Sequence, residues 1–179
     1  MPTTQKQHDQ LIAKQAIYEL SCRYMRGLDR LDKHLLLSVF SADAWCEYGF
    51  INCDAPAFVD FAIGALTEHT ANQHMIGNVL IEFEGNEAFG EVYFNAYHKV
   101  PSDEGFDDIV IAGRYLDRYV EESNEWKFAY RSELVDWSRT TSTNDPYFAA
   151  APDGLRGARQ KDAVYDTARR YRPDQKADK

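Results

Sequence analysis

The feature that most constrains the fold is a change of hydrophobic period in the middle of the chain. From about residue 79 onward, apolar and polar residues alternate with the period of two that is typical of strands with one buried face. Short turns separate these stretches, one at Gly85-Asn86 and one over residues 121–125. The pattern predicts an antiparallel meander of four long strands, the first beginning near Gln73 and the others covering residues 88–99, 109–119 and 126–137.

The N-terminal part of the chain has a helical period instead. Apolar residues recur every four positions from Ile12 to Leu28, which predicts a helix over about residues 9–28 with one buried face. A second, short helix is predicted over 32–40, a turn over 41–44, and a strand over 45–50. A third helix follows Pro56 and continues to about Leu66.

This order predicts an α+β fold, in which three N-terminal helices pack on one face of a curved, mainly antiparallel sheet. We expect residues 9–140 to form this single domain. Residues 141–179 contain several helix and strand breakers, among them Pro146, Pro152 and Pro173. They are predicted to be an irregular C-terminal extension with one short helix near residues 161–170.

The charge distribution narrows the choice of partners. The net charge is −9, and the first 150 residues hold 12 Lys and Arg against 24 Asp and Glu. An acidic body repels phosphate backbones and anionic membranes, so we expect neither a nucleic acid nor a membrane as the main partner. The space that a curved sheet encloses with the helices on its face is instead a natural pocket for a small molecule.

Three cysteines without CxxC spacing, together with a polar N-terminus, predict a cytoplasmic protein with reduced thiols. The sequence has no GxGxxG, phosphate-binding loop, GxSxG or HExxH motif. We therefore expect no nucleotide cofactor and no metal ion.

Three polar residues are the first candidates for chemistry. Tyr24 belongs to the apolar stripe of the first helix, Asp29 follows it near the helix end, and His74 begins the first long strand. A carboxylate that is hydrogen-bonded to one imidazole nitrogen fixes the tautomer and raises the basicity of the other nitrogen. The alternative is that His74 is a core histidine with its hydrogen bonds satisfied, and that Asp29 caps the next helix.

Further residues are candidates for binding a substrate. Arg114 and Arg131 lie on adjacent predicted strands and could bind a carboxylate or phenolate, or could pair with Asp117 or Glu133. His98 is expected to be exposed at the end of a strand. Four further residues on the predicted strands could line the pocket, namely Asn78, Tyr93, Asn95 and Trp137.

The sequence resembles the SnoaL-like branch of the nuclear transport factor 2-like superfamily, over roughly residues 9–140. The resemblance rests on the order and spacing of several segments, namely residues 24–29 (YMRGLD), 40–45 (FSADAW), 74–78 (HMIGN), 112–119 (AGRYLDRY) and 126–128 (WKF), followed by Arg131 and by Asp136-Trp137. It implies a cone-shaped α+β barrel.

Characterised members of that branch include a bile-acid dehydratase, a hexachlorocyclohexane dehydrochlorinase, scytalone dehydratase and formaldehyde-releasing lyases of lignin-derived aromatics. The resemblance implies an elimination without a cofactor, in which His74 is the base, Asp29 its carboxylate partner and Tyr24 an oxygen partner. Arg131 resembles an arginine that several members direct into the pocket. Where the bile-acid enzyme has a further acid, this chain has Asn95 and Ala96, which argues against that substrate.

The resulting hypothesis is a cofactor-independent lyase that acts on a hydrophobic, hydroxylated, aromatic small molecule, such as a lignin-derived compound. A non-catalytic binding or dimerisation module, or an isomerase or epoxide hydrolase, remains the alternative. The resemblance also implies a homodimer or homotrimer.

Overall fold

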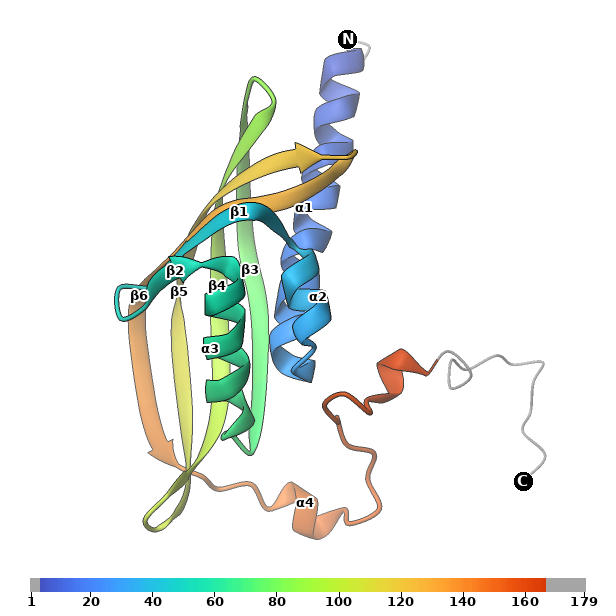
Figure 1. The fold of residues 1–179 in the computed structure, drawn as a ribbon. Coiled ribbons are helices and arrows are strands. Elements are labelled where there is room, and N and C mark those ends of the chain that lie inside the picture. The colour runs from blue at the N-terminus through green and yellow to red at the C-terminus, as the bar shows by residue number, and fades with distance from the viewer. Residues whose placement is uncertain (1–3, 167–179) are drawn as a thin grey trace, which may run out of the picture.

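The computed structural model describes residues 4–166 of the chain. Three helices, α1 (Gln5–Arg30), α2 (Lys33–Ser38) and α3 (Ala55–Thr67), lie on one side of a curved sheet (Figure 1). The strands are β1 (Phe40–Glu47), β2 (Asn52–Asp54), β3 (Ala71–Glu84), β4 (Glu87–Ser102), β5 (Gly105–Glu122) and β6 (Glu125–Ser142). The predicted α+β class is confirmed, with three N-terminal helices and a six-stranded, mainly antiparallel sheet.

The strand order in the sheet is β2-β1-β6-β5-β4-β3. All neighbours are antiparallel except β1 and β6, which are parallel. The connection from β1 to the meander runs through β2 and α3, so the chain crosses from one edge of the sheet to the other. This crossing places the start of β3 beside the end of α1, with which β3 is in contact.

Local sequence explains where the helices begin and end. Thr4 and Gln7 form a reciprocal capping box at the start of α1, and Leu31 ends that helix in the left-handed conformation with φ of 52°. The buried face of α1 carries Leu20, Tyr24 and Leu28, as the four-residue recurrence predicts. Ile12 departs from that prediction, since it is 57% exposed near the N-terminal end of the helix.

The first strand begins earlier than predicted. The stretch 41–44 is not a turn but part of β1, where the register with β6 shifts between the Phe40–Phe128 and Trp45–Tyr130 pairs, and Ser41 and Ala44 are buried. Pairing with a distant strand therefore overrides the local turn propensity of Ser and Asp. The turn lies instead between Glu47 and Asn52, where Gly49 has φ of 75°.

The C-terminal segment lies along the ends of α1 and α3. Arg30 donates to the carbonyl of Ala158 at 2.6 Å, and Arg159 donates to the carbonyls of Leu66 and His69 at 3.0 and 2.6 Å. Two short helical turns occur in it, α4 (Tyr147–Ala150) and the 3-10 helix η1 (Ala163–Tyr165). The helix predicted near 161–170 is thus limited to η1 within the described residues, and positions 167–170 lie outside them. A domain boundary at residue 140 stays a prediction, since β6 continues to Ser142.

Candidate active site

Asp29 and His74 are in direct contact. The Nδ1 atom of His74 lies 2.8 Å from Oδ1 of Asp29, and the backbone N–H of His74 donates to the same carboxylate at 3.0 Å. The side-chain amide of Asn72 donates to Oδ1 as well, at 3.1 Å. Both side chains of the pair are nearly buried, with 7% of His74 and 10% of Asp29 exposed. The carboxylate is therefore fixed by three donors, and it holds one nitrogen of the imidazole.

The local sequence explains this placement. Asp29 lies in the last turn of α1, and β3 passes beside that turn with Asn72 and His74 on its inner side. Asp29 does not cap α2, because Asp32 performs that role by accepting a hydrogen bond from the backbone N–H of Leu35 at 2.9 Å. The alternative that Asp29 caps the next helix is therefore wrong.

His74 borders a mainly apolar cavity of about 180 Å³ between the helices and the sheet. The lining is rich in aromatic side chains, and it includes only a few polar groups, as binding pockets for small molecules typically do. The residues that line it are Tyr24, Leu28, Tyr48, Phe50, Phe58, Phe61, Ala62, Ala65, Leu66, His74, Phe94, Ala96, His98, Ile111, Tyr115 and Glu133.

Two tyrosines form a hydrogen-bonded pair in the wall of this cavity. The hydroxyls of Tyr24 and Tyr48 are 2.8 Å apart, and the Tyr48 ring stacks on Phe58 with centroids 4.5 Å apart. Burial raises the pKa of both phenols above their ordinary value, so both remain neutral hydrogen-bond donors near pH 7. The sequence indicated Tyr24 but missed Tyr48, which lies just past the end of β1 where no periodicity signals its direction.

The prediction that His98 is exposed is wrong, because only 8% of its surface is exposed and it lines the cavity. Its ring packs edge-on against His74 with centroids 5.1 Å apart, and its Nδ1 lies 3.2 Å from Nδ1 of His69. Burial, together with the neighbouring His74 and His69, lowers the pKa of His98 to about 3. The signal was available, since His98 alternates in register with the apolar residues Phe94 and Ala96.

Arg131 lies behind the cavity wall instead of in its lining. The guanidinium is fully buried and makes two hydrogen bonds of 2.8 Å to Asp117. It packs about 4 Å from the ring centroids of Tyr24, Tyr115 and Phe128. Burial opposes its charge, but the adjacent Asp117 carboxylate outweighs that effect and raises the pKa of Arg131 further. Of the two alternatives for Arg131, the ion pair with Asp117 is the one that its position supports.

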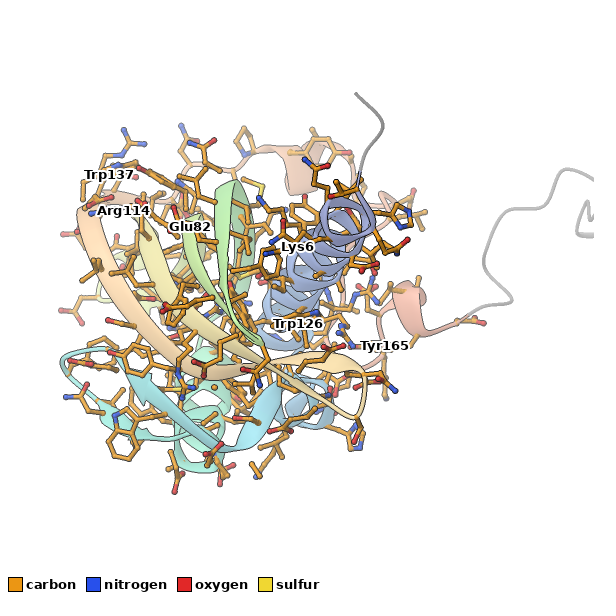
Figure 2. All side chains as sticks on the ribbon, turned by 90° about the horizontal axis from the view of Figure 1, so that it is seen from above. Lys6, Glu82, Arg114, Trp126, Trp137 and Tyr165 are labelled. Carbon is orange, nitrogen blue, oxygen red and sulfur yellow. The ribbon has the colours of Figure 1, made fainter. Side chains whose placement is uncertain are left out.

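Four of the predicted binding residues lie on the outer face of the sheet. Arg114 pairs there with Asp136 at 3.0 Å and with Glu91 at 3.2 Å, and Figure 2 places it beside Trp137, away from α1. Tyr93 and Asn95 lie on the same outer face of β4, because Val92, Phe94 and Ala96 are the buried, inward set. The structure therefore does not bring Arg114, Trp137, Tyr93 or Asn95 together with His74.

Asn78 is turned outward by a β-bulge. The β3–β4 pairing shifts register between Ile76 and Val79, so that Gly77 and Asn78 are both exposed. Strict alternation from His74 predicted that Asn78 faces inward, but one extra residue reverses the faces beyond that point. Val79 and Ile81 take the inward positions instead.

Glu133 is an acidic residue of the cavity that the sequence analysis did not single out for the site. It follows Arg131 by two positions on β6, so both side chains lie on the inner face. Burial raises the pKa of Glu133 to about 7, although the charge of Arg131 and the Tyr115 hydroxyl oppose that rise. A carboxyl group in this state is partly protonated at neutral pH.

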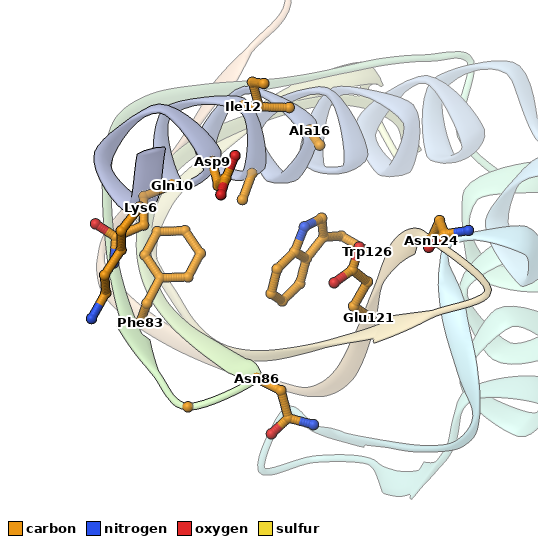
Figure 3. Close-up of a pocket in the computed structure, with 12 residues that line it drawn as sticks. Lys6, Asp9, Gln10, Ile12, Ala16, Phe83, Asn86, Glu121, Asn124 and Trp126 are labelled. Atoms are coloured by element: carbon orange, nitrogen blue, oxygen red, sulfur yellow. The ribbon is translucent and has the colours of Figure 1, made fainter. Parts of the chain in front are cut away.

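A larger cavity of about 580 Å³ lies at the other end of α1 (Figure 3). The rings of Phe83 and Trp126 face α1 there, and the charged residues around them are Lys6, Asp9 and Glu121. None of its lining residues is a histidine or contacts the Asp29–His74 pair. We therefore take the smaller, aromatic cavity as the candidate active site.

Two further observations concern the described residues 4–166. No three His, Cys, Asp or Glu side chains among them are placed to share a metal ion. None of their helices is both long and apolar enough to cross a membrane.

The model of the SnoaL-like domain matches residues 9–132 of the chain. The protein belongs to the SnoaL-like domain family. This membership agrees with the predicted nuclear transport factor 2-like superfamily and with the order of the helices and strands in Figure 1. No curated protein matches the chain.

Solved structures share the SnoaL-like fold at low sequence identity. A proposed scytalone dehydratase from Novosphingobium aromaticivorans is 22% identical, with a TM-score of 0.67 over 75% of this chain and 91% of that protein. The hexachlorocyclohexane dehydrochlorinase LinA-type3 from Novosphingobium barchaimii is 20% identical, with a TM-score of 0.67 over 76% and 94%.

A third protein, from Nostoc punctiforme, has an unknown function and a cystatin-like fold. It is 20% identical, with a TM-score of 0.58 over 76% of this chain and 96% of that one. Similarity at this level establishes the fold, and the chemistry has to be argued from the residues of this chain.

Proposed function

We propose that this protein is a cofactor-independent lyase in which His74 is the catalytic base. The observation that carries the proposal is the 2.8 Å contact between Nδ1 of His74 and Asp29 at the wall of an aromatic cavity. Asp29 holds the imidazole with the proton on Nδ1, so Nε2 can accept a proton from a substrate carbon. The charge of Asp29 then stabilises the imidazolium that forms.

The electron pair of the broken C–H bond forms a new double bond and expels a leaving group from the neighbouring atom. One hydroxyl of the Tyr24–Tyr48 pair donates to the other, and the second can donate a hydrogen bond to a substrate oxygen on which negative charge develops. The raised pKa values of both phenols keep them protonated for that role. Arg131 supports this wall from behind through its contact with the Tyr24 ring, and we assign it no contact with the substrate.

The cavity supports a hydrophobic, aromatic substrate. Its volume of about 180 Å³ fits a small aromatic compound, and the rings of Tyr48, Phe58 and Phe94 offer faces and edges for stacking. We propose a hydroxylated aromatic compound, such as one derived from lignin, which loses water or formaldehyde. The dehydratase and dehydrochlorinase among the structural neighbours are named for eliminations of this general kind.

The test is a screen of hydroxylated aromatic compounds by mass spectrometry, which detects loss of water or of formaldehyde. His74→Ala should lower turnover by at least about 100-fold, because a positioned general base contributes about 100- to 10,000-fold. The matched control is His34→Ala, since His34 is exposed on α2 and outside the cavity. Unchanged turnover in His74→Ala would exclude the proposed role.

A binding module of the same fold needs no contact between a base and a carboxylate, so the Asp29–His74 pair favours the enzyme. An isomerase would use the same pair and return the proton to its substrate. Incorporation of solvent deuterium without loss of a leaving group would identify that reaction.

The homodimer or homotrimer stays a prediction. Exposed apolar side chains on the outer face of the sheet support it, and they include Met75, Leu80, Phe89, Leu116, Leu134 and Trp137. Sedimentation equilibrium measures the mass directly, and a monomer at micromolar concentration would exclude it.

A further inference from the structure

A second group that can transfer a proton lines the same cavity as His74. Glu133 lies on the inner face of β6, whereas His74 lies on β3 at the edge of the sheet, and both line the same cavity. The strands β4 and β5 separate β6 from β3. The register places Glu133 level with Val79 on β3, so it also lies further along the strands than His74. Both residues nevertheless line one cavity of only about 180 Å³. A bound molecule would lie between them.

The Tyr115 hydroxyl donates a hydrogen bond to the Glu133 carboxyl, whose other oxygen can still act on that molecule. Arg131, the nearest cation on β6, already makes two hydrogen bonds to Asp117. The other titratable groups that face Glu133 are the phenols of Tyr115 on β5, Tyr24 on α1 and Tyr48 beyond β1, and burial keeps all three neutral. Glu133 and His74 thus bring an acidic and a basic side chain to the lining of one cavity.

We propose that Glu133 is the general acid of this site and donates a proton to an oxygen leaving group on the substrate. The proposal rests on the proposed function. In one turnover, Nε2 of His74 takes the proton from carbon, and the C–H electron pair forms the double bond. The C–O bond breaks, its electron pair stays on oxygen, and the proton of Glu133 converts that oxygen to water. Proton exchange with solvent then restores neutral His74 and protonated Glu133.

This assignment narrows the substrate class. Hydroxide is a poor leaving group and needs a proton as the C–O bond breaks, whereas a halide leaves without one. An acid in the same cavity as the base therefore points to an uncharged alcohol as substrate and to dehydration as the reaction. A substrate that carries a carboxylate near its leaving oxygen would be repelled whenever Glu133 is ionised.

Two benzisoxazole probes test the role of the acid separately from that of the base. A base removes the ring C–H proton, the N–O bond breaks, and its electron pair moves to the oxygen, which gives a cyanophenolate. The nitro-substituted compound releases a stabilised phenolate that needs no proton. The unsubstituted compound releases a more basic oxygen, which benefits from an acid.

Glu133→Gln keeps the shape of the side chain but has no acidic proton. We expect it to lower kcat/KM about 100-fold for the unsubstituted probe and less than about threefold for the nitro probe. The matched control, Glu82→Gln, changes an exposed glutamate of β3 outside this cavity and should leave both values unchanged. Equal losses on the two probes, or no loss on either, would overturn the assignment.

His74→Ala should abolish both reactions, so its result reports on the proposed function. Failure of the wild type to open either ring would count against that function. The role of Glu133 would then be tested by a measurement that needs no turnover. Carbon-13 NMR of labelled glutamate follows the carboxyl directly, with Glu133→Gln to assign the signal. Titration near pH 7 supports the acid, and titration near the ordinary value of 4.5 refutes it.

Discussion

Asp29 binds His74 twice, once through the ring Nδ1 at 2.8 Å and once through the backbone N–H at 3.0 Å, although the two residues are 45 positions apart. One carboxylate thereby fixes both the path of β3 and the orientation of the imidazole that β3 carries. The end of α1 and the start of β3 are consequently joined at the cavity. The same contact contributes to the fold and to the proposed chemistry.

Asp29→Asn separates these two contributions. The amide keeps one oxygen for the backbone N–H of His74, but it removes the charge that stabilises an imidazolium. We expect turnover to fall by at least about 100-fold and the free energy of unfolding to fall by about 1–3 kcal/mol. Steady-state kinetics and urea unfolding measure the two effects. Asp32→Asn is the matched control, because asparagine also caps helices well, and it should leave activity unchanged.

The hydroxyls of Tyr24 and Tyr48 offer a second prediction. Tyr24→Phe and Tyr48→Phe each leave one hydroxyl without its 2.8 Å partner, whereas the double variant removes both. The double variant should therefore lose less stability than the sum of the single variants, by about 1 kcal/mol. A double-mutant cycle of urea unfolding measures this coupling. Strict additivity would mean that the two hydroxyls do not bond to each other in solution.

Periodicity located most of the fold because the buried faces are regular. The four-residue recurrence from Ile12 to Leu28 identified α1, and alternation identified the strands of the meander. It failed at Asn78, where a bulge inserts one residue into β3 and reverses the faces beyond it. It also failed over 41–44, where the chain stays extended between two residues, Phe40 and Trp45, that pair with β6. Both failures come from irregular pairing between strands, which the alternation within one strand does not reveal.

The candidate site was only partly predictable for a related reason. Asp29 and His74 were identified because their chemistry and the family resemblance point the same way. A sequence does not tell whether an arginine on an inner face meets a substrate or a carboxylate, and Arg131 meets Asp117. Glu133 was considered only as a partner for an arginine, although its position two residues after Arg131 placed both on one face.

The buried pair of Arg131 and Asp117 carries a third prediction. Asp117→Asn leaves the buried guanidinium charge of Arg131 without a carboxylate that balances it. The Nη1 atom of Arg131 already lacks a hydrogen-bond partner among the described residues. Removing one partner of a buried ion pair costs about 3–5 kcal/mol, so we expect a loss of that order in urea unfolding. Asp136→Asn removes a partner of the partly exposed Arg114, which keeps Glu91, and should change stability far less. Similar losses in the two variants would contradict the buried pairing.

His98 and Glu133 influence the pH dependence of stability in opposite directions. The folded state lowers the pKa of His98 from 6.5 to about 3, so between these values only the unfolded chain binds that proton, and stability falls as the pH is lowered. The folded state raises the pKa of Glu133 from 4.5 to about 7, so its contribution is complete below about pH 4.5 and is lost as the pH rises to 7.

Between pH 4.5 and 6.5 the two contributions cancel, and single variants should reveal them. Glu133→Gln should make stability rise with pH in this window, and His98→Gln should make it fall, each with a slope of up to about 1.4 kcal/mol per pH unit. Urea unfolding of both variants at half-unit intervals of pH measures these slopes, with the exposed His34→Gln as control. Slopes for both variants that run parallel to the wild type would show that neither group titrates as its burial requires.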